Sequence, residues 1–467
     1  MNQLVAQHLT RYLILSMFCL GFVRVPVTAD DATLTSKLHE TTPQDCTYFL
    51  PDAQLAEAPV VSYNAAQLMD SFLTYYFAPW ENPFQFFSIE ELHKIEKEKA
   101  LKYQKKPGWG PNRHPLSTDF IVAISDNMHL GTFPNYQQPA ITTHATNLRT
   151  LPCDKPSFTD WVSAGEGYPF DNWQEILVAP NTPLHVLHTS QDGAWHFVVA
   201  DYTYGWIQKE ALAYVTPEFM AQWRKTGQYI TPLRDNVPVK DNMLAPLARV
   251  GQLIPLAPTQ SNKESYQVLT VAKDPSGYAA TQVCTVAKAD TAVMPLLATP
   301  SNMALLADNL MGQPYGWGGK EGYRDCSSLL KDLFLPFGIW LPSDSGPQSK
   351  AGTFISLEDL NAQQKEAFLK KQGVPFFSLI WWPGHIALYI GERAGKPYVY
   401  NDIWGLRTKS MFSKEGRAVI GKVAIMPLDF GKGYSNIKYT LLNKAKGLIL
   451  LNNRLVKPQE RLALHKK

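Results

Sequence analysis

The sequence of 467 residues lacks several features that would assign it to a common functional class. It contains no GxxxxGK[ST] phosphate-binding loop and no spacing of Cys and His residues typical of a zinc site. Its net charge is only +3, so the charge balance does not favour binding to nucleic acid. We therefore expect no metal and no other cofactor, and a chemistry that depends on the protein's own side chains.

The apolar run at the N-terminus, Tyr12–Val23, is too short to span a bilayer, because a membrane helix takes about 20 residues. Val27–Ala29 follows it, with small residues at the two positions that signal peptidase reads. We predict that residues 1–29 are a signal peptide cleaved after Ala29. The mature protein is then secreted or periplasmic, without stable membrane insertion. Retention of this segment as an uncleaved anchor is the alternative.

Cysteine is scarce, with five residues in the chain. Cys19 lies in the apolar run, where the bulky Phe18 before it does not fit a lipoprotein signal. Export would place the other four in an oxidising compartment, namely Cys46, Cys153, Cys284 and Cys326. If Cys326 must stay reduced, at most one structural disulfide can form, and its pairing stays open.

The length predicts about three domains, because hydrophobic cores seldom grow beyond ~250–300 residues. The first part of the chain is helical in pattern. Ser62–Tyr76 has apolar residues at helical spacing, and Ser88 and Glu91 are spaced as a capping box before a charged helix. Another helix is expected over Pro300–Met311.

The middle of the chain has short apolar stretches between turns, which is typical of small β domains. A first group comprises Ile141–Arg149, His185–Leu187, Trp195–Val199 and Gly205–Ile207. A second group comprises Val250–Leu256, Tyr266–Ala272, Ala279–Thr281 and Val286–Ala287. The two groups predict two barrels, with one larger β domain as the alternative. A last strand is expected near Gly447–Leu451 in an otherwise loose, basic tail.

The stretch Tyr315–Asp332 organises the rest of the chain. A glycine-rich loop precedes Cys326, and an amphipathic pattern follows it, so Cys326 is predicted at the N-terminus of a helix. The positive end of a helix dipole lowers the pKa of a cysteine thiol, which favours the nucleophilic thiolate. An inert, packed cysteine is the alternative.

A base for this cysteine is predicted at His385, which begins the alternating strand pattern of GHIALYIGE. The next strand ends in Asn401 and Asp402, and either side chain could accept the free ring N–H of His385 if the two strands pair antiparallel. Asn401 is our first choice and Asp402 the second. A turn that begins at these two residues is the alternative interpretation.

Five motifs in this order resemble the NlpC-type cysteine peptidases of bacterial cell walls, whose core is papain-like. They are YGWGG, RDCSSLL, LPSDSGPQ, GHIALYIG and YVYNDIWGLRT. The resemblance differs at Ser328, where a small residue such as Gly is usual, and at Ser343, where Arg is often found. Upstream, the helical segment and AWHFVVADYTYGWIQKEAL resemble the stabilising segment and a bacterial SH3-like barrel of one multidomain branch of that family.

The resemblance implies an α+β fold in five parts. They are a signal peptide (1–29), a helical stabilising domain (30–135), a first SH3-like barrel (136–235), a second SH3-like barrel (236–292) and a papain-like peptidase domain with a basic tail (293–467). Peptidoglycan stem peptides are the implied partner, and a monomer is expected.

The implied reaction is hydrolysis of the bond between D-Glu and a diamino acid such as diaminopimelate, through a thioester on Cys326. A free N-terminal L-Ala is the implied preference. Cys326, His385 and Asn401 are the implied catalytic residues, and Tyr315, Asp325, Ser327 and Glu166 the implied substrate contacts. The alternatives are an N-acetylmuramoyl-L-alanine amidase, a toxin that acts on another cell's wall, and a wall-binding protein without catalysis.

Overall fold

Capping residues that can be identified in the sequence determine where the N-terminal helices begin. Helix α4 (Ala65–Tyr76) begins after Asn64 and α6 (Ile89–Lys105) after Ser88, and each cap side chain accepts a hydrogen bond from the backbone N–H three residues later. The predicted capping box of Ser88 and Glu91 is confirmed. The remaining helices of this part are α2 (Ala29–Thr41), α3 (Ala53–Ala56), α5 (Ala78–Glu81) and α7 (Thr118–Asn127).

The computed structural model describes residues 29–451, except 62–63, 86, 164, 410–414, 435 and 438. The predicted signal peptide, apart from Ala29, and the end of the basic tail lie outside these residues. Within the described ranges, none of the helices combines the length and the hydrophobicity needed to cross a membrane.

The first β domain is a seven-stranded antiparallel sheet in the order β3-β2-β6-β5-β4-β1-β7. Its strands are β1 (Gln138–Thr142), β2 (Thr146–Arg149), β3 (Gln174–Val178), β4 (Pro183–Thr189), β5 (Trp195–Val199), β6 (Tyr204–Gln208) and β7 (Leu212–Tyr214). The prediction of one strand over Ile141–Arg149 is wrong, because residues 143–145 turn the chain from β1 into β2. Helix α6 packs against this barrel through the Trp206 indole N–H, which donates to the Glu96 carboxylate at 2.8 Å.

A second β domain is built from short strands around its own small core, which includes Val237, Ile254, Val268 and Val286. Its strands are β8 (Tyr229–Pro232), β9 (Val237–Pro238), β10 (Leu247–Ala248), β11 (Ile254–Pro255), β12 (Ser265–Lys273), β13 (Ala279–Ala287) and β14 (Thr291–Val293), with α8 (Pro217–Trp223) before them. Strand β8 pairs with β11 and β14, although it lies within the range predicted for the first barrel. The two short stretches predicted at 279–281 and 286–287 are one strand.

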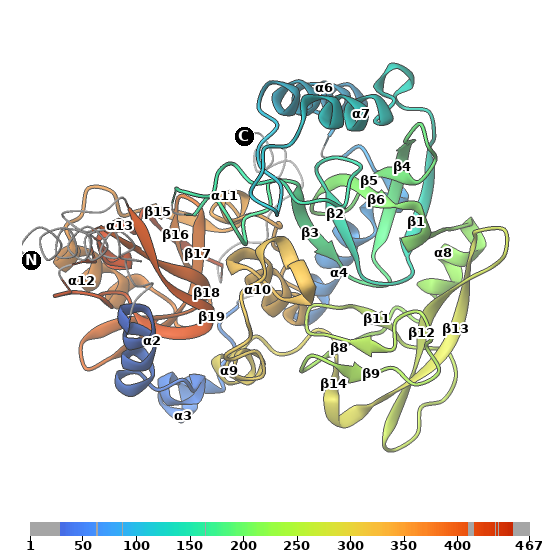
Figure 1. Cartoon of the computed structure of the whole chain (residues 1–467). Helices are drawn as coiled ribbons and strands as arrows, with labels where there is room; N and C mark the ends of the chain where they lie inside the picture. Colours follow the sequence, from blue (N-terminus) through green and yellow to red (C-terminus); the bar gives the residue numbers. More distant parts are fainter. Residues whose placement is uncertain are drawn as a thin grey trace, which may run out of the picture.

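The last domain is a six-stranded sheet in the order β15-β20-β16-β17-β18-β19, with α10 (Cys326–Phe334) packed on one face. Its strands are β15 (Thr353–Ser356), β16 (Ser378–Trp382), β17 (His385–Arg393), β18 (Lys396–Thr408), β19 (Gly416–Pro427) and β20 (Gly447–Leu450). Its other helices are α9 (Pro300–Asp308), α11 (Ser345–Gln348), α12 (Ala362–Gln372) and α13 (Leu441–Lys444). The strand predicted near Gly447 therefore lies inside the sheet, between β15 and β16. Figure 1 shows α10 between this sheet and the first barrel.

The last domain and the first barrel touch through glycines that admit no side chain. A Cβ atom on Gly318 would lie 2.7 Å from Gln174, and one on Gly319 would lie 2.5 Å from Leu177, both on β3. Both glycines also have positive φ values, which L-residues with a side chain rarely adopt. The Gln174 amide completes the contact by donating to the carbonyl oxygen of Gly318 at 2.9 Å. The glycines of YGWGG thus serve close domain packing.

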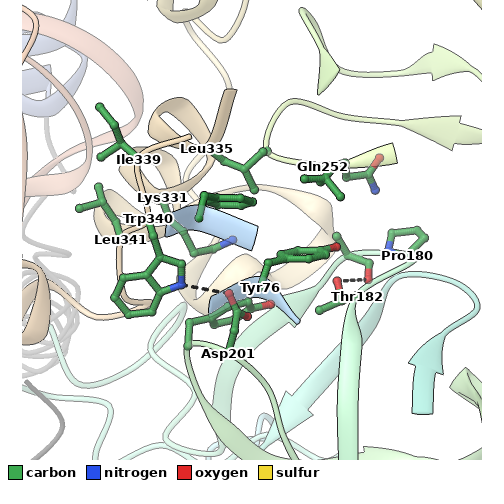
Figure 2. A pocket seen from close by; sticks show the side chains of 15 residues that line it. Tyr76, Pro180, Thr182, Asp201, Gln252, Lys331, Leu335, Ile339, Trp340 and Leu341 are labelled. Atoms are coloured by element: carbon green, nitrogen blue, oxygen red, sulfur yellow. Dashed lines mark hydrogen bonds between the residues drawn. The ribbon is translucent and has the colours of Figure 1, made fainter. Parts of the chain in front are cut away.

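A second contact between these domains lies beside a small pocket bordered by Tyr76, Thr182 and Lys331. Figure 2 shows the Trp340 indole N–H donating to the Asp201 carboxylate across it, at 3.0 Å. Helix α4, the first barrel and the segment after α10 therefore meet at one point.

The guanidinium of Arg324 joins three parts of the chain. It is 1% exposed, and both terminal nitrogens donate to the Asp235 carboxylate, at 2.6 and 2.9 Å. Its Nε donates to Asp332 on α10 at 2.7 Å. The remaining donors meet the side chain of Gln313 and the carbonyl of Val250. Burial raises the pKa of Asp235, but the hydrogen bonds and charge of Arg324 outweigh it and lower the pKa to about 2.

We predict that Asp235→Ala lowers the free energy of unfolding by about 3–5 kcal/mol, because it leaves two N–H donors of the buried Arg324 guanidinium unpaired. Differential scanning calorimetry of both proteins measures the effect. Arg234→Ala is the control, since it removes an exposed ion pair with Asp290 and should change little. Equal, small shifts for the two variants would contradict the prediction.

Candidate active site

Cys326 is the first residue of α10, as the sequence predicts, and Asp325 caps the helix before it. The Asp325 carboxylate accepts the backbone N–H groups of Ser327 and Ser328, at 3.1 and 2.9 Å, and that of Gly318 at 2.9 Å. Because Cys326 is the first residue of α10, its backbone N–H has no acceptor within the helix. It is therefore free to stabilise a developing oxyanion.

The thiol of Cys326 is only 8% exposed, and its environment opposes ionisation. Burial raises the pKa of the thiol, and the carboxyl groups of Asp325 and Asp402 add to this, while the backbone N–H groups of Ile386 and Ser327 act in the opposite direction. The pKa is well above that of a free cysteine. The expectation that the helix dipole lowers it is wrong, because burial and the two carboxyl groups outweigh the helix N-terminus.

His385 is the first residue of β17, and a side chain from the neighbouring strand β18 fixes the orientation of its ring. Its Nε2 lies 3.2 Å from Asn401 Oδ1 on the antiparallel neighbour β18. The Asn401 amide donates to the carbonyl of Ala424 at 3.0 Å, which directs its oxygen toward the ring. Nε2 therefore carries the proton, and Nδ1 keeps a lone pair that can accept one.

Burial lowers the pKa of His385 to about 4, and the hydrogen bond to Asn401 offsets only part of this. At neutral pH the imidazole is uncharged. The Trp382 ring packs on it, with a distance of 5.3 Å between ring centroids.

Asp402, the second choice for a partner of His385, occupies a different place. Its side chain is fully buried, and neither carboxyl oxygen has a hydrogen-bond partner among the residues that the structure describes. Burial raises the pKa of Asp402 well above its usual range, and the charge of Asp325 adds to this. Asn401 is thus the residue that contacts His385, and Asp402 is a buried carboxyl group near Cys326.

Cys326 and His385 open into one cleft of about 640 Å³. Tyr315 lines it as well, and burial and the nearby Cys326 raise the pKa of its phenol well above the usual value. The other lining residues are Gly165, Phe170, Trp317, Trp382, Pro383, Gly384, Ile403, Trp404, Gly405, Leu406, Arg407, Arg417, Tyr439, Thr440, Leu441, Lys444 and Lys446. Among the described lining residues are four Arg or Lys side chains and no carboxylate.

One wall of the cleft comes from the first barrel. Phe170 packs edge-on against Trp317 with 5.1 Å between ring centroids, and it also reaches Tyr315 and Trp404. The Trp317 indole N–H donates to the carbonyl of Asp171 at 3.0 Å. The barrel loop that contains Gly165 and Phe170 therefore closes one side of the site.

Of the four predicted substrate contacts, one lines the cleft and three do not. Tyr315 faces the cleft, whereas Asp325 and Ser327 lie behind Cys326 and bond to each other. Glu166 follows Gly165 in the barrel loop and is not among the lining residues. Sequence reasoning missed Arg417, whose place depends on strand register and on a loop from another domain.

The cysteines that the structure describes are all free, namely Cys46, Cys153, Cys284 and Cys326. No group of three or more potential metal ligands is found within the described ranges.

Four family models match successive parts of the chain. Residues 12–133 match the N-terminal NLPC_P60 stabilising domain, and residues 156–208 match an SH3 domain of SH3b1 type. Residues 217–260 match an SH3 domain of SH3b2 type, and residues 312–395 match the NlpC/P60 family.

A solved structure described as a novel NlpC/P60 endopeptidase from Photobacterium damselae subsp. piscicida is similar over most of the chain. The two are 26% identical, the match covers 88% of this chain and 98% of that one, and the TM-score is 0.78.

Two curated relatives are each named gamma-D-glutamyl-L-lysine dipeptidyl-peptidase. The protein of Bacillus subtilis (strain 168) is 34% identical over 82 residues, which is 17% of this chain and 26% of the relative. That of Bacillus cereus (strain ATCC 10987 / NRS 248) is 35% identical over 83 residues, or 18% and 23%. The chain thus spans about a quarter of the length of the curated relatives it matches.

We predict that Cys326 is alkylated slowly at neutral pH and faster as the pH rises, because its raised pKa leaves little thiolate. The measurement is iodoacetamide labelling between pH 5 and 9, quantified by peptide mass spectrometry. A Cys326→Ser protein identifies the labelled peptide. Rapid labelling that is independent of pH between 5 and 8 would instead indicate a stable thiolate paired with an imidazolium.

Proposed function

Because the chain belongs to the NlpC/P60 family, with a stabilising domain and two SH3 domains before the catalytic domain, we propose that it is an exported cysteine endopeptidase of peptidoglycan stem peptides. The observation that carries this proposal is the shared cleft of Cys326 and a neutral His385 whose ring is oriented by Asn401. Export rests on the signal-peptide pattern that ends at Ala29.

The first half of the reaction is acylation. His385 Nδ1 takes the proton from the Cys326 thiol as the sulfur attacks the scissile carbonyl carbon. The backbone N–H of Cys326 holds the oxyanion that forms, and Tyr315 lies beside it to orient the substrate carbonyl. The C–N bond then breaks, and the proton on His385 passes to the leaving amine. The acyl group remains as a thioester on Cys326.

The second half is hydrolysis of the thioester. His385 accepts a proton from water as the oxygen attacks the carbonyl carbon, and it returns this proton to the sulfur when the C–S bond breaks. Asn401 keeps the same ring nitrogen available in both halves by holding the proton on Nε2.

We assign the scissile bond to the one between D-Glu and a diamino acid such as diaminopimelate, in a stem peptide with a free N-terminal L-Ala. The barrel wall around Phe170 supports a short substrate, because it closes one side of the cleft to a polymer. Asp325 and Ser327 lie behind Cys326, and Glu166 lies outside the cleft lining, so the proposed preference for a free N-terminus rests on this wall and not on these three residues. A short, unacylated N-terminus needs less room beside the wall than one that carries a sugar.

We predict that the mature protein cleaves L-Ala-γ-D-Glu-meso-diaminopimelate and releases L-Ala-γ-D-Glu, whereas the N-acetylmuramoyl form of this peptide is cut at least tenfold more slowly. Mass spectrometry of the products measures both. Release of the whole peptide from the sugar would indicate an amidase instead. A Cys326→Ala protein is the control, and full hydrolysis by it would exclude the nucleophile assigned here.

We predict an acid limb near pH 4 in the profile of kcat/KM, because His385 is an effective base only when unprotonated and its pKa is lowered to about 4. An ordinary histidine would lose this form below about pH 6.5. The measurement is the tripeptide assay from pH 3 to 8. Asp402→Asn is the control, and it should leave the limb in place because Asp402 makes no hydrogen bond to His385, whose ring partner is Asn401. A limb near pH 6.5 would contradict the prediction.

A further inference from the structure

Two arginines lie directly opposite each other at one end of the cleft. Arg407 on β18 and Arg417 on β19 are register partners, and both line the cleft. Like charges at directly opposed positions of an antiparallel pair destabilise it unless an anion relieves them. A bound anion would therefore reduce the repulsion between the two guanidinium groups.

Among the residues that the structure describes, Arg407 forms an ion pair and Arg417 does not, although the charge of Glu415 also acts on Arg417. Arg407 Nε lies 3.2 Å from the Glu415 carboxylate. Arg417 has no ion pair in the described part of the chain, and its buried Nη1 makes no hydrogen bond there. A buried guanidinium nitrogen without an acceptor is costly, and because Nη1 is itself covered, a ligand meets the guanidinium through the part of Arg417 that lines the cleft.

The first barrel determines where the Arg417 side chain lies. Gly165 has a positive φ of 89°, and a Cβ atom on it would approach Arg417 Nη2 to 3.1 Å. The barrel loop therefore packs against the guanidinium and holds it at the cleft wall. The position results from two domains and is not that of a solvated surface arginine.

The other cations of the cleft are already engaged. Lys446 lies 3.4 Å from the Glu358 carboxylate, and Lys444 lies over the ring of Tyr439 at 3.8 Å from its centroid. With no carboxylate among the described lining residues, the cleft favours an anionic substrate. A carboxylate is the anion that a stem peptide carries, and a guanidinium can bind it through two parallel hydrogen bonds.

We propose that Arg417 is a specificity-determining residue that binds a carboxylate of the stem peptide. This inference rests on the proposed function and adds the chemical group that the cleft recognises. Besides the C-terminal carboxylate, which is an amide in a longer stem peptide, two carboxylates of the tripeptide fit the chemistry: the α-carboxylate of D-Glu, which the γ-linkage leaves free, and the side-chain carboxylate of diaminopimelate.

Three substrates, each with an amidated C-terminus, distinguish these sources. The first is L-Ala-γ-D-Glu-meso-diaminopimelate, the second has L-Lys in place of diaminopimelate and so lacks the side-chain carboxylate, and the third has D-isoglutamine in place of D-Glu. We measure kcat/KM for each with the wild-type protein, Arg417→Gln, Arg417→Lys and Lys422→Gln. Lys422 is the matched control, because it lies on the same strand outside the cleft lining.

We expect Arg417→Gln to lower kcat/KM by about 10- to 100-fold for the substrates that keep the bound carboxylate, and less than twofold for the one that lacks it. Arg417→Lys should restore part of the loss, and Lys422→Gln should behave as wild type. An equal loss on all three substrates would show a structural role and overturn the inference. If the wild-type protein cleaves none of them, the proposed function fails, and the inference falls with it.

Discussion

The buried charge of Arg324 is the interaction on which the geometry of the site depends. A guanidinium stays protonated in a protein, so each of its donors must meet an acceptor inside the molecule. The acceptors come from the second β domain, from the start of the catalytic domain and from α10. Because Arg324 directly precedes the cap Asp325 and the proposed nucleophile Cys326, the network that joins the domains also determines where α10 begins.

The cleft is completed by a domain that carries none of the reacting groups. Gly318 and Gly319 let the loop before Cys326 lie directly on β3, and Gly165 lets the barrel loop lie on Arg417. An alanine at any of these positions would clash with the opposite domain or strain the backbone. The first barrel therefore forms a wall of the cleft, and this supports the proposed preference for a short stem peptide over an intact wall polymer.

Local patterns were sufficient to predict α10, the strand that begins at His385 and the contact of Asn401, because each depends on spacing within one or two neighbouring elements. They were insufficient where tertiary contacts decide. The pKa of Cys326 rises because of burial and the carboxyl groups of Asp325 and Asp402, and only the folded sheet brings Asp402 near. The role of Arg417 depends on cross-strand register and on a loop about 250 residues away in sequence.

The two pKa shifts act together on the resting state. A raised thiol pKa and a lowered imidazole pKa leave Cys326 and His385 both uncharged at neutral pH, so the field in the cleft comes from its arginines and lysines. Such a field attracts carboxylates without a competing thiolate nearby. A neutral thiol also resists oxidation, since the thiolate is the reactive form. In an exported enzyme, which we propose this to be, a nucleophile that ionises only when His385 takes its proton during attack remains intact between turnovers.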